Sequence, residues 1–161
     1  MDLQLIPATD ADLPFACDLT RQAMLPYYSR FDLLWSDSGF AEAWQWRDNR
    51  LVTAGGEVCG YVSLSQDPRA FYIRELHLLP SARGQGLGSQ VLDWALTLAA
   101  SRGLPRARLL VFKGNPAQSL YRRKGFVVVG EDDSVWRMER RVDSPDAPRG
   151  RRLSDGSLAA E

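Results

Sequence analysis

Histidine and cysteine are scarce in this chain, which has one histidine, His77, and two cysteines, Cys17 and Cys59, among 161 residues. The two cysteines lie far apart in the sequence and form no pair at metal-ligand spacing. We therefore expect neither a structural zinc site nor any other bound metal. Two unpaired thiols favour a reducing compartment, and the sequence predicts a cytoplasmic protein.

Net charge and long apolar runs are lacking as well. Twenty Lys and Arg residues balance twenty Asp and Glu residues, so the formal net charge is zero. This balance does not favour nucleic-acid binding, which usually requires a broad cationic surface. No stretch approaches the roughly 18–20 apolar residues of a membrane span, and the first residues lack the basic region of a signal peptide. We expect no membrane association.

The remaining composition is that of a globular domain. Hydrophobic residues make up 45% of an 18.0 kDa chain, which is enough to bury a core without disulfides. From residue 143 the composition changes to two prolines, two glycines and three serines with little apolar periodicity. The sequence therefore predicts one domain over residues 1–142 and a flexible tail over residues 143–161.

Apolar periodicity and turn residues predict the element order β-α-α-β-β-β-α-β-α-β-β, which indicates an α+β or mixed α/β fold. Thr9 and Asp12 have the spacing of a helix capping box, and Asn115 followed by Pro116 is typical of another helix start. Strands are expected at residues 3–6, 51–54, 58–64, 71–79, 108–112, 127–130 and 135–141. Helices are expected after Thr9, over about 39–46, from the glycine-rich turn to about 102, and over 116–124.

A glycine-rich turn, Arg83-Gly84-Gln85-Gly86-Leu87-Gly88, separates the strand at 71–79 from the helix that follows. Three residues without Cβ allow backbone amides to approach a bound group closely, and the helix adds its positive dipole end. This arrangement favours a phosphate or pyrophosphate, although a plain tight turn remains an alternative. A P-loop is excluded because no Lys-Ser or Lys-Thr follows. A dinucleotide fingerprint fits poorly because its third glycine is displaced and the acidic residue is missing.

The turn resembles the Arg-x-x-Gly-x-Gly motif of the GNAT superfamily, the Gcn5-related N-acetyltransferases. A second segment, Asn115-Pro116-Ala117-Gln118-Ser119-Leu120-Tyr121 ending in Gly125-Phe126, resembles that family's Asn-x-Ala-x-x-Leu-Tyr signature. The resemblance spans about residues 3–142. It implies a mixed, strongly twisted central sheet with helices on both faces, as in acyl-CoA N-acyltransferases.

The resemblance also implies acetyl-coenzyme A as the cofactor. Its pyrophosphate would be held by the turn, its pantetheine arm by the strand before the turn, and its sulfur by Tyr121, acting as the catalytic acid. The implied cofactor-binding residues are Leu76, His77, Leu78, Arg83, Gly84, Gln85, Gly86, Leu87, Gly88, Ser89, Asn115 and Tyr121.

The general base is less obvious in the sequence. In the family it often lies on the strand before the glycine turn, at positions that fall here on Tyr72 and Arg74. Neither side chain is a base at neutral pH. Glu75 and His77 lie beside them, but regular alternation puts both on the other face, and only a bulge would reverse that. Glu75 is the candidate base, and a water-mediated route is the alternative.

The acceptor site is predicted from an arginine and several aromatic residues. Tyr72 and Arg74 would face the acceptor, and a guanidinium there favours an acceptor with a carboxylate. The aromatic stretch from Tyr27 to Trp46 corresponds to the part of the family that roofs the acceptor, which makes Tyr27, Tyr28 and Trp35 candidate pocket residues.

The sequence thus predicts direct transfer of an acetyl group from acetyl-coenzyme A to a primary amine of a small molecule or peptide. The alternatives are an acyl-coenzyme A sensor with the same fold and no turnover, and a nucleotide-dependent oxidoreductase. A homodimer is compatible with the resemblance, but no residue indicates an interface.

Overall fold

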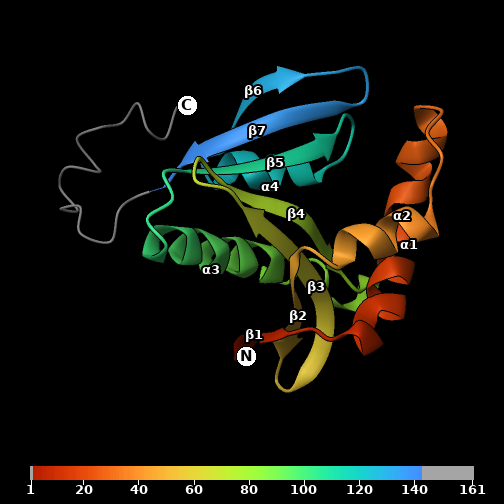
Figure 1. Cartoon of the computed structure of the whole chain (residues 1–161), viewed down its shortest axis with the longest axis horizontal. Coiled ribbons are helices and arrows are strands. Elements are labelled where there is room, and N and C mark those ends of the chain that lie inside the picture. The colour runs from red at the N-terminus through yellow and green to blue at the C-terminus, as the bar shows by residue number, and fades with distance from the viewer. Residues whose placement is uncertain (1, 143–161) are drawn as a thin grey trace. The chain divides into compact units, whose positions relative to one another are not determined.

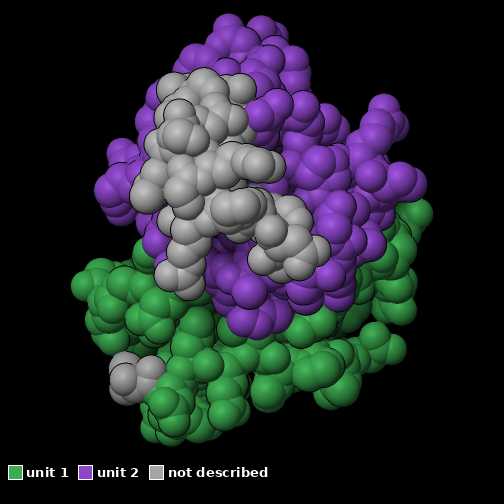
Figure 2. Space-filling view, turned by 90° about the vertical axis from the view of Figure 1, so that its left-hand side faces the viewer, with its two compact units in different colours: residues 1–65, 74–91 green, residues 66–73, 92–161 purple. Residues whose placement is uncertain are grey.

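The computed structural model describes residues 2–142, which form one mixed seven-stranded sheet with helices (Figure 1). The strand order in the sheet is β1-β2-β3-β4-β5-β7-β6. The chain divides into two compact units, shown in green and purple in Figure 2. Within the described residues, unit 1 contains residues 2–65 and 74–91, and unit 2 contains residues 66–73 and 92–142.

The elements follow one another in the order expected from the sequence. In the first half of the chain they are β1 (Leu3–Pro7), the 3-10 turn η1 (Asp10–Asp12), α1 (Leu13–Arg30), α2 (Asp37–Trp44), β2 (Asp48–Ala54) and β3 (Glu57–Gln66). In the second half they are β4 (Phe71–Leu78), η2 (Pro80–Ala82), α3 (Leu87–Ser101), β5 (Arg106–Phe112), α4 (Ala117–Arg123), β6 (Val127–Glu131) and β7 (Val135–Arg141).

Local signals account for most element boundaries. The predicted capping box is present, because Thr9 accepts from the backbone of Ala11 and its own amide donates to Asp12 at 2.8 Å. Two glycines with positive φ, Gly55 and Gly56, form the turn of the β2–β3 hairpin. α1 continues to Arg30, beyond the apolar face from which it was predicted, and it accommodates Pro26.

Each unit has its own buried side chains. In unit 1 the core is made by α1, α2, the β2–β3 hairpin and the start of α3, with Ala16, Leu19, Trp44, Leu51, Val52, Ala54, Tyr61, Val62, Leu64, Ala82, Leu87 and Val91 buried. In unit 2 the buried side chains are Ala70, Phe71, Ile73, Leu92, Ala95, Ala99, Leu104, Ala107, Leu109, Val111, Phe126 and Met138.

In unit 2, β4 pairs with β5 in parallel at Phe71–Ile73, and β7 pairs antiparallel with both β5 and β6. Within residues 2–142, no helix is long and apolar enough to cross a membrane, and no three His, Cys, Asp or Glu side chains are grouped as metal ligands. The predicted tail, residues 143–161, lies outside the described residues.

Candidate functional site

The glycine-rich turn adopts the backbone that the sequence predicts. Gly84 and Gly86 have φ angles of 75° and 80°, and α3 begins at Leu87, whose side chain is buried. A Cβ at either glycine would meet no atom within 4 Å. The two glycines are therefore required for their left-handed backbone rather than for lack of room, and the space around the turn stays open.

Two side chains of the turn bond back to the segment before it. Arg83 Nε donates to the carbonyl of Leu78 at 3.1 Å, and Gln85 Nε2 donates to the carbonyl of Ser81 at 2.9 Å. The amide of Gln90 donates a helical hydrogen bond to the carbonyl of Gly86, and the amides of residues 87–89 precede it in the first turn of α3. Amides in the first turn of a helix have no intrahelical partner, so they suit an anion. The turn therefore fits a pyrophosphate.

The end of β4 lies close to β3. Leu79 donates its amide to the carbonyl of Cys59 at 2.7 Å, and a Cβ on Gly60 would collide with the carbonyl oxygen of His77. Leu78 packs against the cluster of Ala54, Ala82 and Leu87. The backbone at 76–78, predicted to bind the pantetheine arm, is thus held by β3 and by the start of α3.

The alternation expected along β4 is wrong at Glu75. Arg74 Nε donates to Ser65 Oγ at 2.8 Å, and its guanidinium lies 5.6 Å from the centre of the Trp46 ring. Glu75, the next residue, has Oε2 at 3.9 Å from Arg47 NH1. Arg74 bonds to Ser65 and His77 stacks on Tyr61, and Ser65 and Tyr61 lie on one face of β3, yet residues 74 and 77 of a regular strand would lie on opposite faces. An irregularity of the kind that a bulge produces therefore brings Glu75 to this side.

His77 lies on the same side as Glu75. Its Nε2 is 2.8 Å from Glu75 Oε1, and its ring centre is 5.9 Å from that of Tyr61. The prediction that His77 points to the opposite face from Arg74 is therefore also wrong. Glu75 is half-buried, with a quarter of its side chain exposed, so its carboxylate is accessible to a ligand while His77 fixes one of its oxygens.

Two of the three aromatic residues predicted for the acceptor pocket belong to a continuous series of ring contacts. Successive ring centres are 5.4 to 6.3 Å apart along Tyr28, Trp35, Phe40, Trp44, Tyr61 and His77. Burial raises the pKa of Tyr28, and the negative charge of Glu75 adds to this effect. Tyr28 and Trp35 thus belong to this series of rings, the aromatic wall, which ends at His77 and its bonded partner Glu75. The Tyr27 ring packs instead against Arg30.

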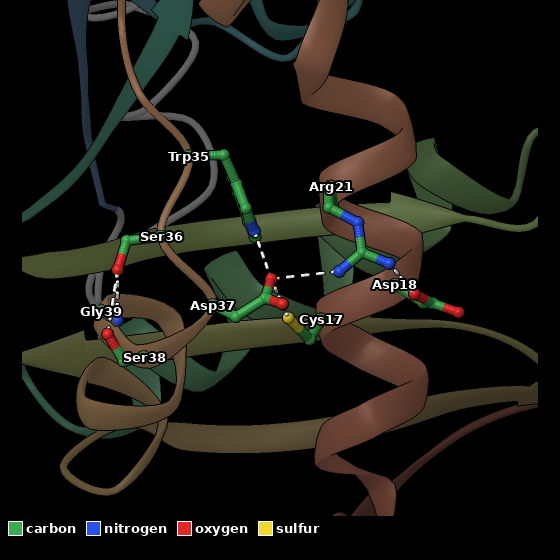
Figure 3. A network of polar contacts seen from close by, with 8 residues as sticks. All are labelled: Cys17, Asp18, Arg21, Trp35, Ser36, Asp37, Ser38 and Gly39. Atoms are coloured by element: carbon green, nitrogen blue, oxygen red, sulfur yellow. Dashed lines mark hydrogen bonds and ion pairs between the residues drawn. The ribbon is translucent and has the colours of Figure 1, made fainter.

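A polar network centred on Asp37 joins α1 to the start of α2 (Figure 3). Asp37 Oδ1 accepts from Trp35 Nε1 at 2.6 Å, from Arg21 NH1 at 3.0 Å and from Cys17 Sγ at 3.5 Å. The bonds from Trp35, Cys17 and Arg21 lower the pKa of the Asp37 carboxyl. Trp35, a predicted acceptor-site residue, is therefore held in place by a charged hydrogen bond.

Arg47 and Tyr61 were not predicted from the sequence. Arg47 is largely buried, and burial lowers the pKa of its guanidinium, an effect that Glu75 opposes. Tyr61 is fully buried, and its hydroxyl forms a short hydrogen bond with that of Thr20. In the sequence, only their positions could have pointed to these two residues. Arg47 follows the aromatic stretch, and Tyr61 lies in the apolar run of the hairpin.

Unit 2 carries the other predicted site residues. Tyr121, on α4, packs edge to face with Phe126, with ring centres 6.2 Å apart. Asn115 Oδ1 accepts from the amide of Ala117 at 2.9 Å, the capping bond that the sequence indicates. The Tyr72 hydroxyl donates to Asp67 Oδ2 at 2.8 Å and accepts from Arg108 NH1 at 3.4 Å, so this predicted acceptor residue also has a structural role.

The mixed seven-stranded sheet, with a glycine turn between β4 and α3, has the acyl-CoA N-acyltransferase-like fold, which it shares with the solved structures described below. A family model described as the Acetyltransferase (GNAT) family matches residues 18–126, and the chain belongs to this family.

Two curated relatives match about half of the chain. A mycothiol acetyltransferase from Streptomyces bingchenggensis is 35% identical over 92 residues, which cover 55% of this chain and 30% of that protein. An aminoalkylphosphonate N-acetyltransferase from Salmonella typhimurium is 36% identical over 84 residues, covering 48% of this chain and 54% of that protein. The chain therefore matches about half or less of the length of these relatives.

Solved structures show the same fold over nearly the whole described chain. The PaiA N-acetyltransferase of Thermoplasma acidophilum, in complex with coenzyme A, has a TM-score of 0.68 at 20% identity, covering 88% of this chain and 99% of that one. The spermidine N-acetyltransferase of Vibrio cholerae, with CoA and spermine, has a TM-score of 0.68 at 22% identity, covering 87% of this chain and 95% of that one.

Proposed function

We propose that this protein is an N-acetyltransferase that transfers an acetyl group from acetyl-coenzyme A to a primary amine. The observation that carries the proposal is the open glycine turn at the N-terminus of α3, in a chain of the GNAT family. The relative and the neighbour named for acetyl transfer to amines, and the two neighbours that contain coenzyme A, support it.

The turn would bind the pyrophosphate through the amides of Leu87, Gly88 and Ser89, with Arg83 and Gln85 at its rim. The backbone of residues 76–78 would pair with the pantetheine arm. Bound acetyl-coenzyme A would supply the acetyl group as a reactive thioester. The chain would contribute mainly by holding the amine and the thioester together, which removes the entropic cost of a bimolecular encounter.

Glu75 would act as the general base. An acceptor amine arrives protonated, and Glu75 would take its proton, directly or through a water molecule. The amine nitrogen would then form its bond to the acetyl carbon while the carbon–sulfur bond breaks. Tyr121 would give its proton to the leaving sulfur, a role that rests on its place in the Asn115–Phe126 signature. The proton that the nitrogen loses on becoming an amide would be passed through water to restore Tyr121, and Glu75 would release its own proton to solvent.

The test measures binding and turnover separately. Acetyl-coenzyme A should raise the melting temperature, whereas NADH and ATP should not. A ligand at 100 times its Kd stabilises the folded state by about 2.7 kcal/mol, which is a shift of several degrees. An amine panel should then release free thiol, and Glu75→Gln should lower kcat about 100-fold or more with the melting shift preserved.

The matched control is Glu57→Gln, an exposed carboxylate at the start of β3, which should leave kcat unchanged. A melting shift without thiol release on any amine would identify a non-catalytic sensor instead. No shift with saturating acetyl-coenzyme A would overturn the proposal, because the glycine turn would then be structural.

Two further proposals come from the sequence. We propose a cytoplasmic location, because both cysteines, Cys17 and Cys59, are free thiols in the structure. We also propose that the protein forms a homodimer, which light scattering would test.

A further inference from the structure

The two oxygens of the Glu75 carboxylate have different surroundings. Oε1 lies 2.8 Å from His77 Nε2, which is a hydrogen-bond distance. Oε2 lies 3.9 Å from Arg47 NH1, an ion-pair distance that is too long for a hydrogen bond. Among the described residues, no donor forms a hydrogen bond with Oε2. One oxygen is therefore held by a neighbouring side chain, and the other can accept a proton from a bound ligand.

The His77 side chain is itself held from behind. Its ring lies at a tilt on that of Tyr61, with the ring centres 5.9 Å apart, and Tyr61 is fully buried and bonded to Thr20. The carbonyl oxygen of His77 lies against Gly60 on β3, where a Cβ would collide with it. Only 10% of the His77 side chain is accessible, against 25% for Glu75. An acceptor amine would therefore meet the carboxylate and not the imidazole.

We infer that His77 is a positioning residue, which fixes Glu75 Oε1 so that Oε2 is the oxygen that takes the proton of the acceptor amine. The inference rests on the proposed acetyltransferase function and gives the His77 side chain a role in it. An ionised carboxylate only accepts hydrogen bonds, so Nε2 carries the hydrogen of the bond to Oε1. In this step the proton moves from the amine nitrogen to Oε2, and the nitrogen keeps the electron pair that attacks the thioester.

The bond from His77 limits the rotation of the carboxylate. The last torsion of a glutamate side chain is broad, so an unbonded carboxylate samples many orientations. Without His77, the nearest charged group would be Arg47, and the carboxylate would turn toward its guanidinium to form a charge-assisted hydrogen bond. Oε2 would then be occupied when the amine arrives. Loss of the bond should therefore slow proton transfer and leave the binding of both substrates nearly unchanged.

The first experiment compares two replacements of His77. His77→Phe keeps an aromatic ring against Tyr61 and removes the donor, whereas His77→Gln loses the ring and keeps a donor amide. With the fastest amine of the panel, His77→Phe should lower kcat about 10- to 100-fold and leave KM within about twofold, and His77→Gln should recover most of that loss. Melting temperatures confirm that both variants fold. If His77→Phe is at least as active as His77→Gln, the role of His77 is structural and the inference is wrong.

The second experiment combines His77→Phe with Glu75→Gln. Because His77 is inferred to act only through Glu75, the double variant should have a kcat within about twofold of that of Glu75→Gln alone. The matched control combines His77→Phe with Glu57→Gln, an exposed carboxylate at the start of β3, and should show the full loss of His77→Phe. If His77→Phe costs as much in the Glu75→Gln variant as in the wild type, His77 acts on the substrates directly and is not a positioning residue.

An NMR measurement separates this inference from the proposed function. His77 is the one histidine of the chain, so a sample without a histidine tag gives a single set of imidazole signals. Long-range 1H–15N spectra at about pH 8 should show a hydrogen on Nε2, and its signal should shift in Glu75→Leu, which removes the acceptor. An Nε2 without hydrogen in the wild type would overturn the inference even if amines release thiol. An Nε2 that carries hydrogen, with no thiol released from any amine, would support the His77–Glu75 bond and overturn acetyl transfer.

Discussion

At the scale of single residues, Tyr61 fixes the position of the candidate base. Its ring contacts those of Trp44 and His77, and its hydroxyl bonds to Thr20 on α1. Burial raises the pKa of Tyr61 well above its usual value, and the charge of Glu75 adds to the effect. Tyr61 therefore stays a neutral phenol across the working pH range, and it supports His77, which in turn holds Glu75.

The Tyr61–Thr20 hydrogen bond can be tested by a double-mutant cycle. Tyr61→Phe leaves the buried Thr20 hydroxyl without its partner and should cost about 1–3 kcal/mol in the free energy of unfolding. Because Thr20→Val removes the other hydroxyl, the double variant should lose less than the sum of the two single variants. Denaturant unfolding of the four proteins measures the coupling. Strict additivity would show that the two hydroxyls do not interact.

Residues whose role is local were predictable from the sequence, and residues whose role depends on distant neighbours were not. The backbones of Gly84 and Gly86 and the cap at Asn115 follow from adjacent residues. The face of Glu75 depends on an irregularity of β4, which regular alternation cannot reveal. Arg47 acquires its importance only from Glu75 and Arg74, which are about 30 residues away in sequence.

At the scale of elements, the position of α2 relative to α1 depends on one exposed carboxylate. Asp37 is the first residue of α2, and its carboxylate accepts hydrogen bonds from Cys17 and Arg21 on α1 (Figure 3). α1 and α2 lie side by side in Figure 1, and both supply rings to the aromatic wall. The aromatic stretch predicted as an acceptor roof is thus two helices joined by a short loop, and the sequence located only the second of these helices within it.

The Asp37 network predicts a pH dependence of stability. The folded-state pKa of Asp37 is lowered, chiefly by the bond from Trp35, so its stabilisation is fully present above the unfolded carboxyl pKa of about 3.9. That stabilisation is lost as the pH falls through the lower folded-state value. Asp37→Asn should therefore melt below the wild type at pH 7, and the difference should shrink as the pH falls below about 4.

The matched control is Glu57→Gln, an exposed carboxylate at the start of β3, which should melt like the wild type at both pH values. A difference between Asp37→Asn and wild type that stays constant from pH 7 to pH 3 would contradict the role of the Asp37 charge. Added salt should reduce the difference at pH 7, because these groups are exposed.

At the scale of the whole molecule, the element order follows the sequence more closely than the site does. All seven strands and four α-helices expected over residues 2–142 are present in the expected order. Each element has its own signal of alternating apolar residues and turn glycines, so an error in predicting one element leaves the predictions of the others unchanged. The division into two units was not predicted, because it depends on contacts rather than on composition, and its boundaries fall near the end of β3 and inside β4 and α3.

The domain boundary proposed at residue 142 can be tested by truncation. The buried side chains lie between Ala16 and Met138, β7 ends at Arg141, and the amide of Val142 donates to the carbonyl of Pro105 at 2.9 Å. A chain ending at residue 142 should therefore melt within about 2 °C of the full chain and keep its response to acetyl-coenzyme A. A chain ending at residue 137 is the contrasting variant. It removes Met138, which pairs with Leu109 and is almost fully buried, and should cost about 2–5 kcal/mol or prevent folding. A drop of more than about 5 °C on removing only residues 143–161 would mean that this segment contributes to the fold, and the boundary would have to move beyond residue 142.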